Sequence, residues 1–516
     1  MSKTGRTHNS LRNTFVGVSS HIVTALFSFV SRTVFVTVLG AHYLGISGLF
    51  SNILTMLALS DLGIYTVLVY SLYKPLAEND QNRVKALVNF YQKLYNIIAI
   101  VVLALGLACV PFLPYLVNGS TLTYNEMLLY YILLLSNSVC SYFAISKSTL
   151  LRADQQMHIV QLVSSVSVFG LQIAQILILM LTHQYVFYLI IQIIFTLGNN
   201  VVLTLIATKK YPYLKGKPDI ESIAPIKKEI FANVRATFLY KIGNTIMNST
   251  DNILISVIVG TVVVGYYSNY VTIYTLVNSF VMIIIQAILP SIGNYYATQE
   301  PEKKFHLFRT LMLLFYAIGA FCASCYICGM DDFITLWLGE EFVIGGTFVL
   351  ILALNRFVFC AIHPLWMTRE SAGVFVSTRY LMLCAAAINI ALSIALGMVM
   401  GVSGIILATA LSNILTIIWY EPLQLCKRVF NRSVLAYFTY AARLIVAVIP
   451  VFAIAYIIKI SISGSFVLLL LKFLICGVAT LISFVVVMYN TAELAYIKQI
   501  ALKVIRKITR RREHNL

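Results

Sequence analysis

Apolar runs long enough to cross a lipid bilayer follow one another along almost the whole of this 516-residue sequence. A hydrocarbon core about 30 Å thick requires roughly 20 residues of helix, and we count fourteen runs of that length. Only 11% of the residues are charged, which is too little for the surface of a soluble protein. The sequence therefore predicts an all-α polytopic membrane protein with about 14 transmembrane helices. The expected spans are 13–39, 44–73, 88–117, 125–150, 159–182, 184–207, 237–260, 265–295, 307–329, 344–367, 379–400, 403–425, 436–458 and 464–489.

Lys and Arg residues gather in alternate loops between these runs. With a cytoplasmic N-terminus, the inner loops hold most of the basic residues, and the outer loops hold almost none apart from Lys459. Because the cytoplasmic loops of membrane proteins are rich in Lys and Arg, we expect both termini to be cytoplasmic. The net charge of +18 is then expected to face anionic lipid, and nucleic acid is not expected as a partner.

Two spans that lie 220 residues apart share one pattern of polar residues and glycines. The first set is His21, Thr24, Ser28, Ser31 and Arg32, followed by Gly40 and Gly45; the second is Lys241, Asn244, Asn248, Asp251 and Asn252, followed by Gly260 and Gly265. On an α-helix the polar positions of each set fall within about 100° of one face. Because an even number of spans separates the two sets, both halves are expected to enter the membrane from the same side, as a parallel repeat.

The repeat and the longest predicted inner loop divide the chain into two pseudo-symmetric six-helix lobes plus two C-terminal helices. This loop contains several Pro and Gly residues. We predict an N-lobe at 1–207 with spans 1–6, a cytoplasmic linker at 208–236, a C-lobe at 237–428 with spans 7–12, extra spans 13–14 at 429–489, and a basic cytoplasmic tail at 490–516.

A polar stripe on each of two equivalent membrane helices is typical of a transporter with a wet cavity between its halves. An ionisable side chain at the centre of a span costs about 2.5–3.5 kcal/mol on insertion scales, so it needs a partner or water. Basic side chains in such a cavity suit an anionic ligand, since a guanidinium binds phosphate in a bidentate way. The candidate substrate-binding residues are Arg32, Lys241, Arg356, Ser28, Asn244, Asn248 and Asn252.

Two carboxylates in the spans, Asp251 and Asp61, are candidates for coupling transport to H⁺ or Na⁺. The Asn side chains around Asp251 could complete a cation site. A structural ion pair, such as Arg32 with Asp251, is the alternative. The sequence carries no enzyme motif and no convincing metal-ligand pattern, so neither a catalytic residue nor a cofactor is expected.

Three segments resemble the Wzx-type polysaccharide flippases of the PST branch of the MOP exporter superfamily. They are VFVTVLGAHYLGISGLFSNILTMLALSDLGI in the first two spans, DNILISVIVGTVVVGYYSNY from Asp251, and TLWLGEEF at 335–342. The resemblance extends over about residues 10–489. It implies a V-shaped bundle of two six-helix lobes and two extra helices in the bacterial cytoplasmic (inner) membrane. It also implies a cationic central cavity and, in at least some members, ion coupling.

The same resemblance implies a substrate and partners. The substrate would be an undecaprenyl-pyrophosphate-linked oligosaccharide, moved from the inner to the outer leaflet by alternating access for capsule, O-antigen or another surface polysaccharide. Membrane lipid and the polysaccharide polymerase machinery would be its other partners.

Two other functions stay open at this point. A MATE-like cation-coupled drug antiporter would favour acidic, aromatic cavities and usually stops at twelve spans. A membrane polysaccharide polymerase tends to carry a large outer loop with catalytic Arg or His, whereas the outer loops expected here are short.

Overall fold

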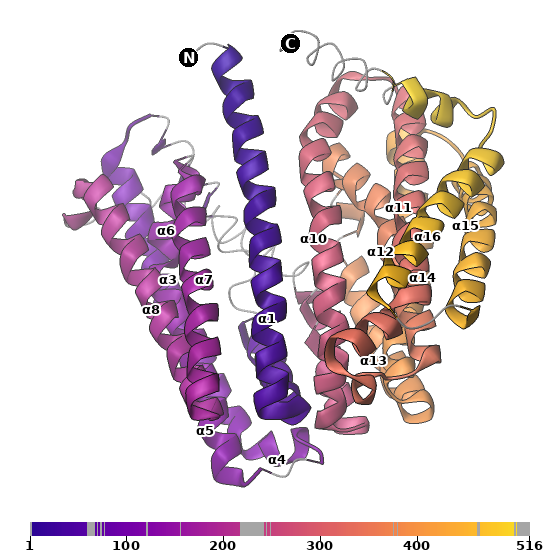
Figure 1. Cartoon of the computed structure of the whole chain (residues 1–516). Coiled ribbons are helices and arrows are strands. Elements are labelled where there is room, and N and C mark those ends of the chain that lie inside the picture. Colours follow the sequence, from indigo (N-terminus) through magenta and orange to yellow (C-terminus); the bar gives the residue numbers. More distant parts are fainter. Residues whose placement is uncertain are drawn as a thin grey trace, which may run out of the picture. The chain divides into compact units, whose positions relative to one another are not determined.

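The computed structural model is helical throughout its ordered elements, and the described residues contain no strand (Figure 1). The prediction of an all-α protein is confirmed. The structure describes residues 3–58, 68–69, 71–72, 75–76, 78–119, 122–154, 156–216, 242–243, 245–247, 249–374, 376–378, 380–461, 465–499 and 502.

The chain forms two compact units, Met1–Ser268 and Asn269–Leu516. The labelled helices of the first unit are α1 (Lys3–Leu57), α3 (Gln81–Cys109), α4 (Leu113–Leu116), α5 (Tyr124–Ser141), α6 (Ile145–Ala153), α7 (Met157–Thr182) and α8 (Tyr185–Lys210). In this unit α7 packs against α1 and α8, and α5 packs against α8. A capping box between Thr123 and Glu126 starts α5.

Helix α10 (Thr261–Thr298) begins in the first unit and ends in the second. The second unit continues with α11 (Pro301–Leu338), α12 (Gly346–Ala372), α13 (Leu381–Met400), α14 (Val402–Leu425), α15 (Leu435–Ser461) and α16 (Phe466–Val487). Helix α11 is the centre of this unit because it packs against α12, α15 and α16. The lobe boundaries predicted at 207 and 237 stay a prediction, and linker residues 217–236 lie outside the described residues.

Twelve helices in the described part of the chain are long and apolar enough to cross a membrane. The first of them, Phe27–Leu57, is broken at Gly40, where φ is 85°, between the spans expected at 13–39 and 44–73. The span expected at 237–260 is described with gaps, and its residues 249–258 are helical. Counting Phe27–Leu57 as two spans and adding the span at 237–260 brings the twelve to about 14. The prediction of about 14 membrane helices is therefore confirmed.

The two copies of the sequence repeat meet at equivalent glycines. A Cβ on Gly45 would lie 2.0 Å from the Thr261 carbonyl oxygen, and a Cβ on Gly265 would lie 2.1 Å from the Ala41 carbonyl oxygen. Gly45 and Gly265 are 220 residues apart, and so are Ala41 and Thr261. The contact is therefore reciprocal, which indicates a local two-fold relation between the second half of α1 and the start of α10. Only glycine permits so close an approach of two backbones.

Ion pairs attach the last two membrane helices to α11. Lys459 Nζ lies 2.8 Å from Asp331 Oδ2, and the buried Lys472 pairs with Asp332 and donates to the Cys328 carbonyl oxygen at 3.1 Å. At the other end of α11, Arg309 Nε lies 3.1 Å from Glu493 Oε1. Because these pairs hold both ends of α11, the extra helices belong to the packing of the second unit.

We predict that Gly45→Ala and Gly265→Ala each destabilise the protein, because the added methyl group would overlap a backbone carbonyl. Overpacking of this kind typically costs about 1–3 kcal/mol. Gly198→Ala is the matched control, since a Cβ there would meet nothing within 4 Å and Ala favours helix. Thermal unfolding of the detergent-purified proteins measures the effect. Equal midpoints for all three variants would show that the glycine contact is not close in the folded protein.

Candidate functional site

The structure describes five of the nine predicted site residues with their side chains. Ser28, Arg32, Asp251 and Asn252 lie in the first unit, and Arg356 lies in the second. The other four, Lys241, Asn244, Asn248 and Asp61, lie outside the described residues, as do the side chains of His21 and Thr24.

Arg32 is tied to the beginning of α10. Its Nη2 donates to Ser268 Oγ at 2.6 Å, and Ser268 Oγ in turn donates to the Gly265 carbonyl oxygen at 2.8 Å. The guanidinium therefore contacts the turn of helix that follows the reciprocal glycine contact. One helical turn before Arg32, Ser28 Oγ accepts from Gln172 Nε2 of α7 at 2.8 Å. Thus the stripe on α1 makes polar contacts with both α7 and α10.

Aromatic rings from three helices gather beside Arg32. Tyr188 lies within electrostatic range of the guanidinium and packs against Phe35, with ring centroids 5.0 Å apart. Tyr185 stacks on Tyr188 at 5.9 Å and has Tyr130 edge-on at 4.9 Å. The sequence did not predict this cluster, because its members come from α1, α5 and α8.

The second stripe is described in part, at Asp251 and Asn252. Both residues are half-buried, and Asn252 Nδ2 lies 3.8 Å from the position that a Cβ on Gly48 would take. Asn252 therefore faces the second half of α1, inside the first unit. The pairing of Arg32 with Asp251 and the cation-coupling role of Asp251 stay predictions.

Arg356 on α12 is fully buried, with 0% of its surface exposed. Its Nη1 donates to Asn278 Oδ1 of α10 at 3.3 Å, while its Nε and Nη2 have no hydrogen-bond partner. The guanidinium carbon lies 5.3 Å from the centre of the Tyr274 ring and 5.5 Å from that of Phe359. Among the described residues no carboxylate forms an ion pair with it. Arg356 is thus a buried cation whose described neighbours are aromatic faces, one amide and the thiols of Cys322 and Cys360, and these stabilise it only in part.

A second buried arginine on the same helix has the counter-ion that Arg356 lacks. Arg369 Nη1 lies 3.2 Å from Glu421 Oε1, and the two side chains are 4% and 1% exposed. This pair ties α12 to α14. The contrast separates an arginine with a buried counter-ion from one without, and burying an unpaired charge costs several kcal/mol.

The chemistry that these groups can perform is recognition. A guanidinium with two free donors can bind two oxygens of one phosphate, and Ser, Asn and Gln side chains suit sugar hydroxyls.

Cys328 Sγ lies 3.5 Å from Cys476 Sγ, and both thiols are free. No group of three His, Cys, Asp or Glu side chains in the described part of the chain could hold a metal ion.

Comparison with known proteins places this geometry in context. The family model described as "Polysaccharide biosynthesis protein" matches residues 10–295, which is more than half of the chain. No curated protein matches the chain in sequence.

Three solved structures illustrate the likeness in fold. The lipid II flippase MurJ in an inward closed conformation is 13% identical, with a TM-score of 0.68 over 92% of this chain and 99% of its own. An inward-facing multidrug resistance MATE family transporter of the MOP superfamily is 13% identical, with a TM-score of 0.59 over 83% and 99%. The MATE multidrug transporter DinF-BH in complex with R6G is 16% identical, with a TM-score of 0.55 over 80% and 94%.

We predict that Arg356→Met keeps or raises thermal stability, because it removes a buried charge that has no counter-ion. Arg369→Met should instead destabilise the protein by about 3–5 kcal/mol, since it leaves Glu421 buried and unpaired. Thermal unfolding of the two purified variants in one detergent makes the comparison. A loss of stability at Arg356 as large as that at Arg369 would assign Arg356 a structural role.

Proposed function

The chain belongs to the polysaccharide biosynthesis protein family, and from this premise we propose that it is a flippase for a lipid-linked oligosaccharide. In this proposal it moves undecaprenyl-pyrophosphate-linked repeat units from the inner to the outer leaflet of the bacterial cytoplasmic membrane. The units supply capsule, O-antigen or another surface polysaccharide. Both termini are cytoplasmic, and the polymerase machinery receives the product.

The observation that carries the proposal is the uncompensated charge of Arg356. A pyrophosphate brings negative charge to a buried guanidinium whose Nε and Nη2 have no partner. Charge-assisted hydrogen bonds of this kind are about twice as strong as neutral ones. Substrate binding then offsets the free-energy cost of burying Arg356 in the folded protein. The Tyr274 and Phe359 rings hold the side chain in place before the phosphate arrives.

The stripe on α1 carries polar groups of the kind that bind phosphates and sugars. Arg32, Ser28 and Gln172 present donors and acceptors that match phosphate oxygens and sugar hydroxyls. Lys241, Asn244, Asn248 and Asn252, at the equivalent positions of the sequence repeat, are the further substrate contacts in this proposal. Alternating access exposes these groups to one side of the membrane at a time.

A multidrug antiporter is the competing function, because MATE transporters share the fold. A buried arginine without a counter-ion would repel the organic cations that a MATE-like drug antiporter would export. The family match and this charge therefore both favour an anionic, saccharide-bearing substrate.

We predict that Arg32→Ala and Arg356→Ala each abolish glycan export, because each removes a phosphate contact. The Arg→Lys variants keep the charge but lose the bidentate fork, so export should fall by roughly tenfold. Arg428→Ala is the control, since Arg428 is exposed and bonds only to Gln424 among the described side chains. Export is measured in cells that depend on this chain, at matched protein levels.

The position of the accumulated substrate distinguishes a flippase from a polymerase. Loss of flipping leaves single repeat units on the inner leaflet, whereas loss of polymerisation leaves them on the outer leaflet. Normal export by both alanine variants would falsify the phosphate role.

We also propose that a carboxylate couples transport to an H⁺ or Na⁺ gradient, with Asp251 as the first candidate and Asp61 as the second. An Asp251→Asn protein should fold and bind substrate but lose its dependence on the gradient. Transport into liposomes with imposed pH or Na⁺ gradients measures this. A variant that still responds to the gradient at the parental rate excludes Asp251 as the coupling group.

A further inference from the structure

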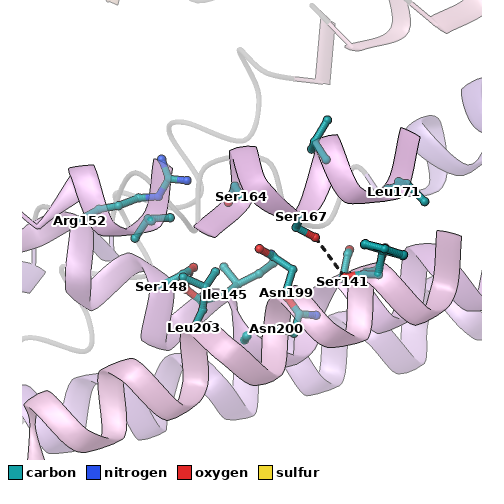
Figure 2. A pocket seen from close by; sticks show the side chains of 15 residues that line it. Ser141, Ile145, Ser148, Arg152, Ser164, Ser167, Leu171, Asn199, Asn200 and Leu203 are labelled. Carbon is teal, nitrogen blue, oxygen red and sulfur yellow. Dashed lines mark hydrogen bonds between the residues drawn. The ribbon is translucent and has the colours of Figure 1, made fainter. Parts of the chain in front are cut away.

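A cavity of about 310 Å³, lined by both polar and apolar side chains, lies in the first unit between α6, α7, α8 and the end of α5. It was not predicted from the sequence. Figure 2 shows hydroxyl and amide side chains converging on it from these helices, with Arg152 at one end. A cavity of this size holds a headgroup rather than a single ion.

One buried acceptor in this cavity has no protein partner. Asn199 Oδ1 is buried without a hydrogen bond, and it lies across the cavity from Ser164 and Ser167 (Figure 2). Its neighbour Asn200 is different, because Asn200 Nδ2 donates to the Cys140 carbonyl oxygen at 2.7 Å. A buried amide oxygen without a partner costs free energy, so the cavity favours a ligand that donates a hydrogen bond at Asn199.

The charge of the cavity comes from Arg152, near the end of α6. Among the described residues no carboxylate pairs with Arg152. The nearest acid in sequence, Asp154, is engaged elsewhere, since its Oδ2 accepts from the Tyr211 hydroxyl at 2.6 Å. The Arg152 guanidinium is therefore available to an anion.

The surface beside the cavity is apolar and exposed. Val168, which lines the cavity, is 40% exposed, and Val166 on α7 and Val201 on α8 are 64% and 56% exposed. Both helices are candidate membrane spans. In a bilayer this surface faces hydrocarbon, so a ligand held in the cavity can keep an apolar chain against it.

We propose that this cavity binds the headgroup of a phosphate-bearing lipid, with the phosphate at Arg152, headgroup hydroxyls at Ser164 and Asn199, and the lipid chain along α7 and α8. The inference rests on the proposed function for one point, the cytoplasmic position of the Arg152 end. A free inorganic anion fits less well, because most of the lining is neutral and only one cation is present. A purely apolar ligand would leave the hydroxyls and Asn199 Oδ1 without partners.

Two lipids carry this chemistry. One is an anionic phospholipid such as phosphatidylglycerol, whose headgroup joins a phosphate to hydroxyls. The other is the lipid-linked saccharide itself, which would then dock on the first unit before it is transported. Both place a phosphate beside hydroxyls at the inner leaflet, and the experiment distinguishes them.

The test is native mass spectrometry of the full chain released from nanodiscs, with three probes compared. These are phosphatidylglycerol in a phosphatidylcholine background, an undecaprenyl-pyrophosphate-linked saccharide, and inorganic pyrophosphate alone. We expect at least one lipid to remain bound, and Arg152→Gln to weaken that binding by about tenfold, the effect of losing a hydrogen bond to a charged group. Lys209→Gln is the matched control. Lys209 is an exposed cation in the last turn of α8, as Arg152 is a cation in the last turn of α6, but it does not line the cavity. Asn199→Leu, which fills the cavity and leaves Arg152 in place, should weaken binding as well.

Each outcome decides the proposal. Retention of phosphatidylglycerol alone assigns the site to membrane phospholipid, and retention of the lipid-linked saccharide alone assigns it to the substrate. Equal losses in Arg152→Gln and Lys209→Gln would reveal only diffuse attraction to anionic lipid and overturn the site, as would unchanged binding in Arg152→Gln and Asn199→Leu. Binding of pyrophosphate as strong as that of either lipid would reassign the cavity to a soluble anion. An Arg356→Ala protein that exports no glycan but binds lipid normally separates this site from the proposed function.

Discussion

The backbone contact between Gly45 and Gly265 determines the geometry around Arg32. No side chain separates the two segments there, since a Cβ on either glycine would lie about 2 Å from a carbonyl oxygen of the other segment. The contact fixes where α10 begins relative to α1. Ser268 follows Gly265 by less than one helical turn, so it comes within 2.6 Å of Arg32 Nη2. A glycine pair far apart in the sequence thus positions a cation of the candidate site.

The duplication explains why this contact is possible. Gly40 and Gly260 are equivalent in the repeat, and both have positive φ, 85° and 135°. Each breaks the helical path just before a close-packed helix starts. A single segment of this kind needs a partner of matching shape, and a duplicated segment meets that need when its two copies face each other. The two copies of the repeat therefore provide both surfaces of the contact.

The sequence predicted the membrane helices well, because the length of an apolar run reports directly on bilayer thickness. It also identified Arg356 as a candidate, because a charge inside an apolar run is expensive wherever the helix lies. It could not identify Asn278, Gln172 or Ser268 as partners, nor the ring cluster of Phe35, Tyr185 and Tyr188. Their spacing along each helix is ordinary, and only the packing of separate helices brings them together. The cavity at Arg152 was missed for the same reason.

The buried cations of the second unit differ in whether a carboxylate forms an ion pair with them among the described residues. Lys472 and Arg369 have carboxylate partners, Asp332 and Glu421, that fix α16 to α11 and α12 to α14. Arg356 has an amide and two aromatic faces. A phosphate arriving at Arg369 or Lys472 would have to displace a carboxylate of like charge. At Arg356 it displaces no anion, and the aromatic rings that hold the guanidinium do not compete for its free N–H groups. In the proposed flippase, this neutral environment would let the buried Arg356 bind an anionic substrate and release it again.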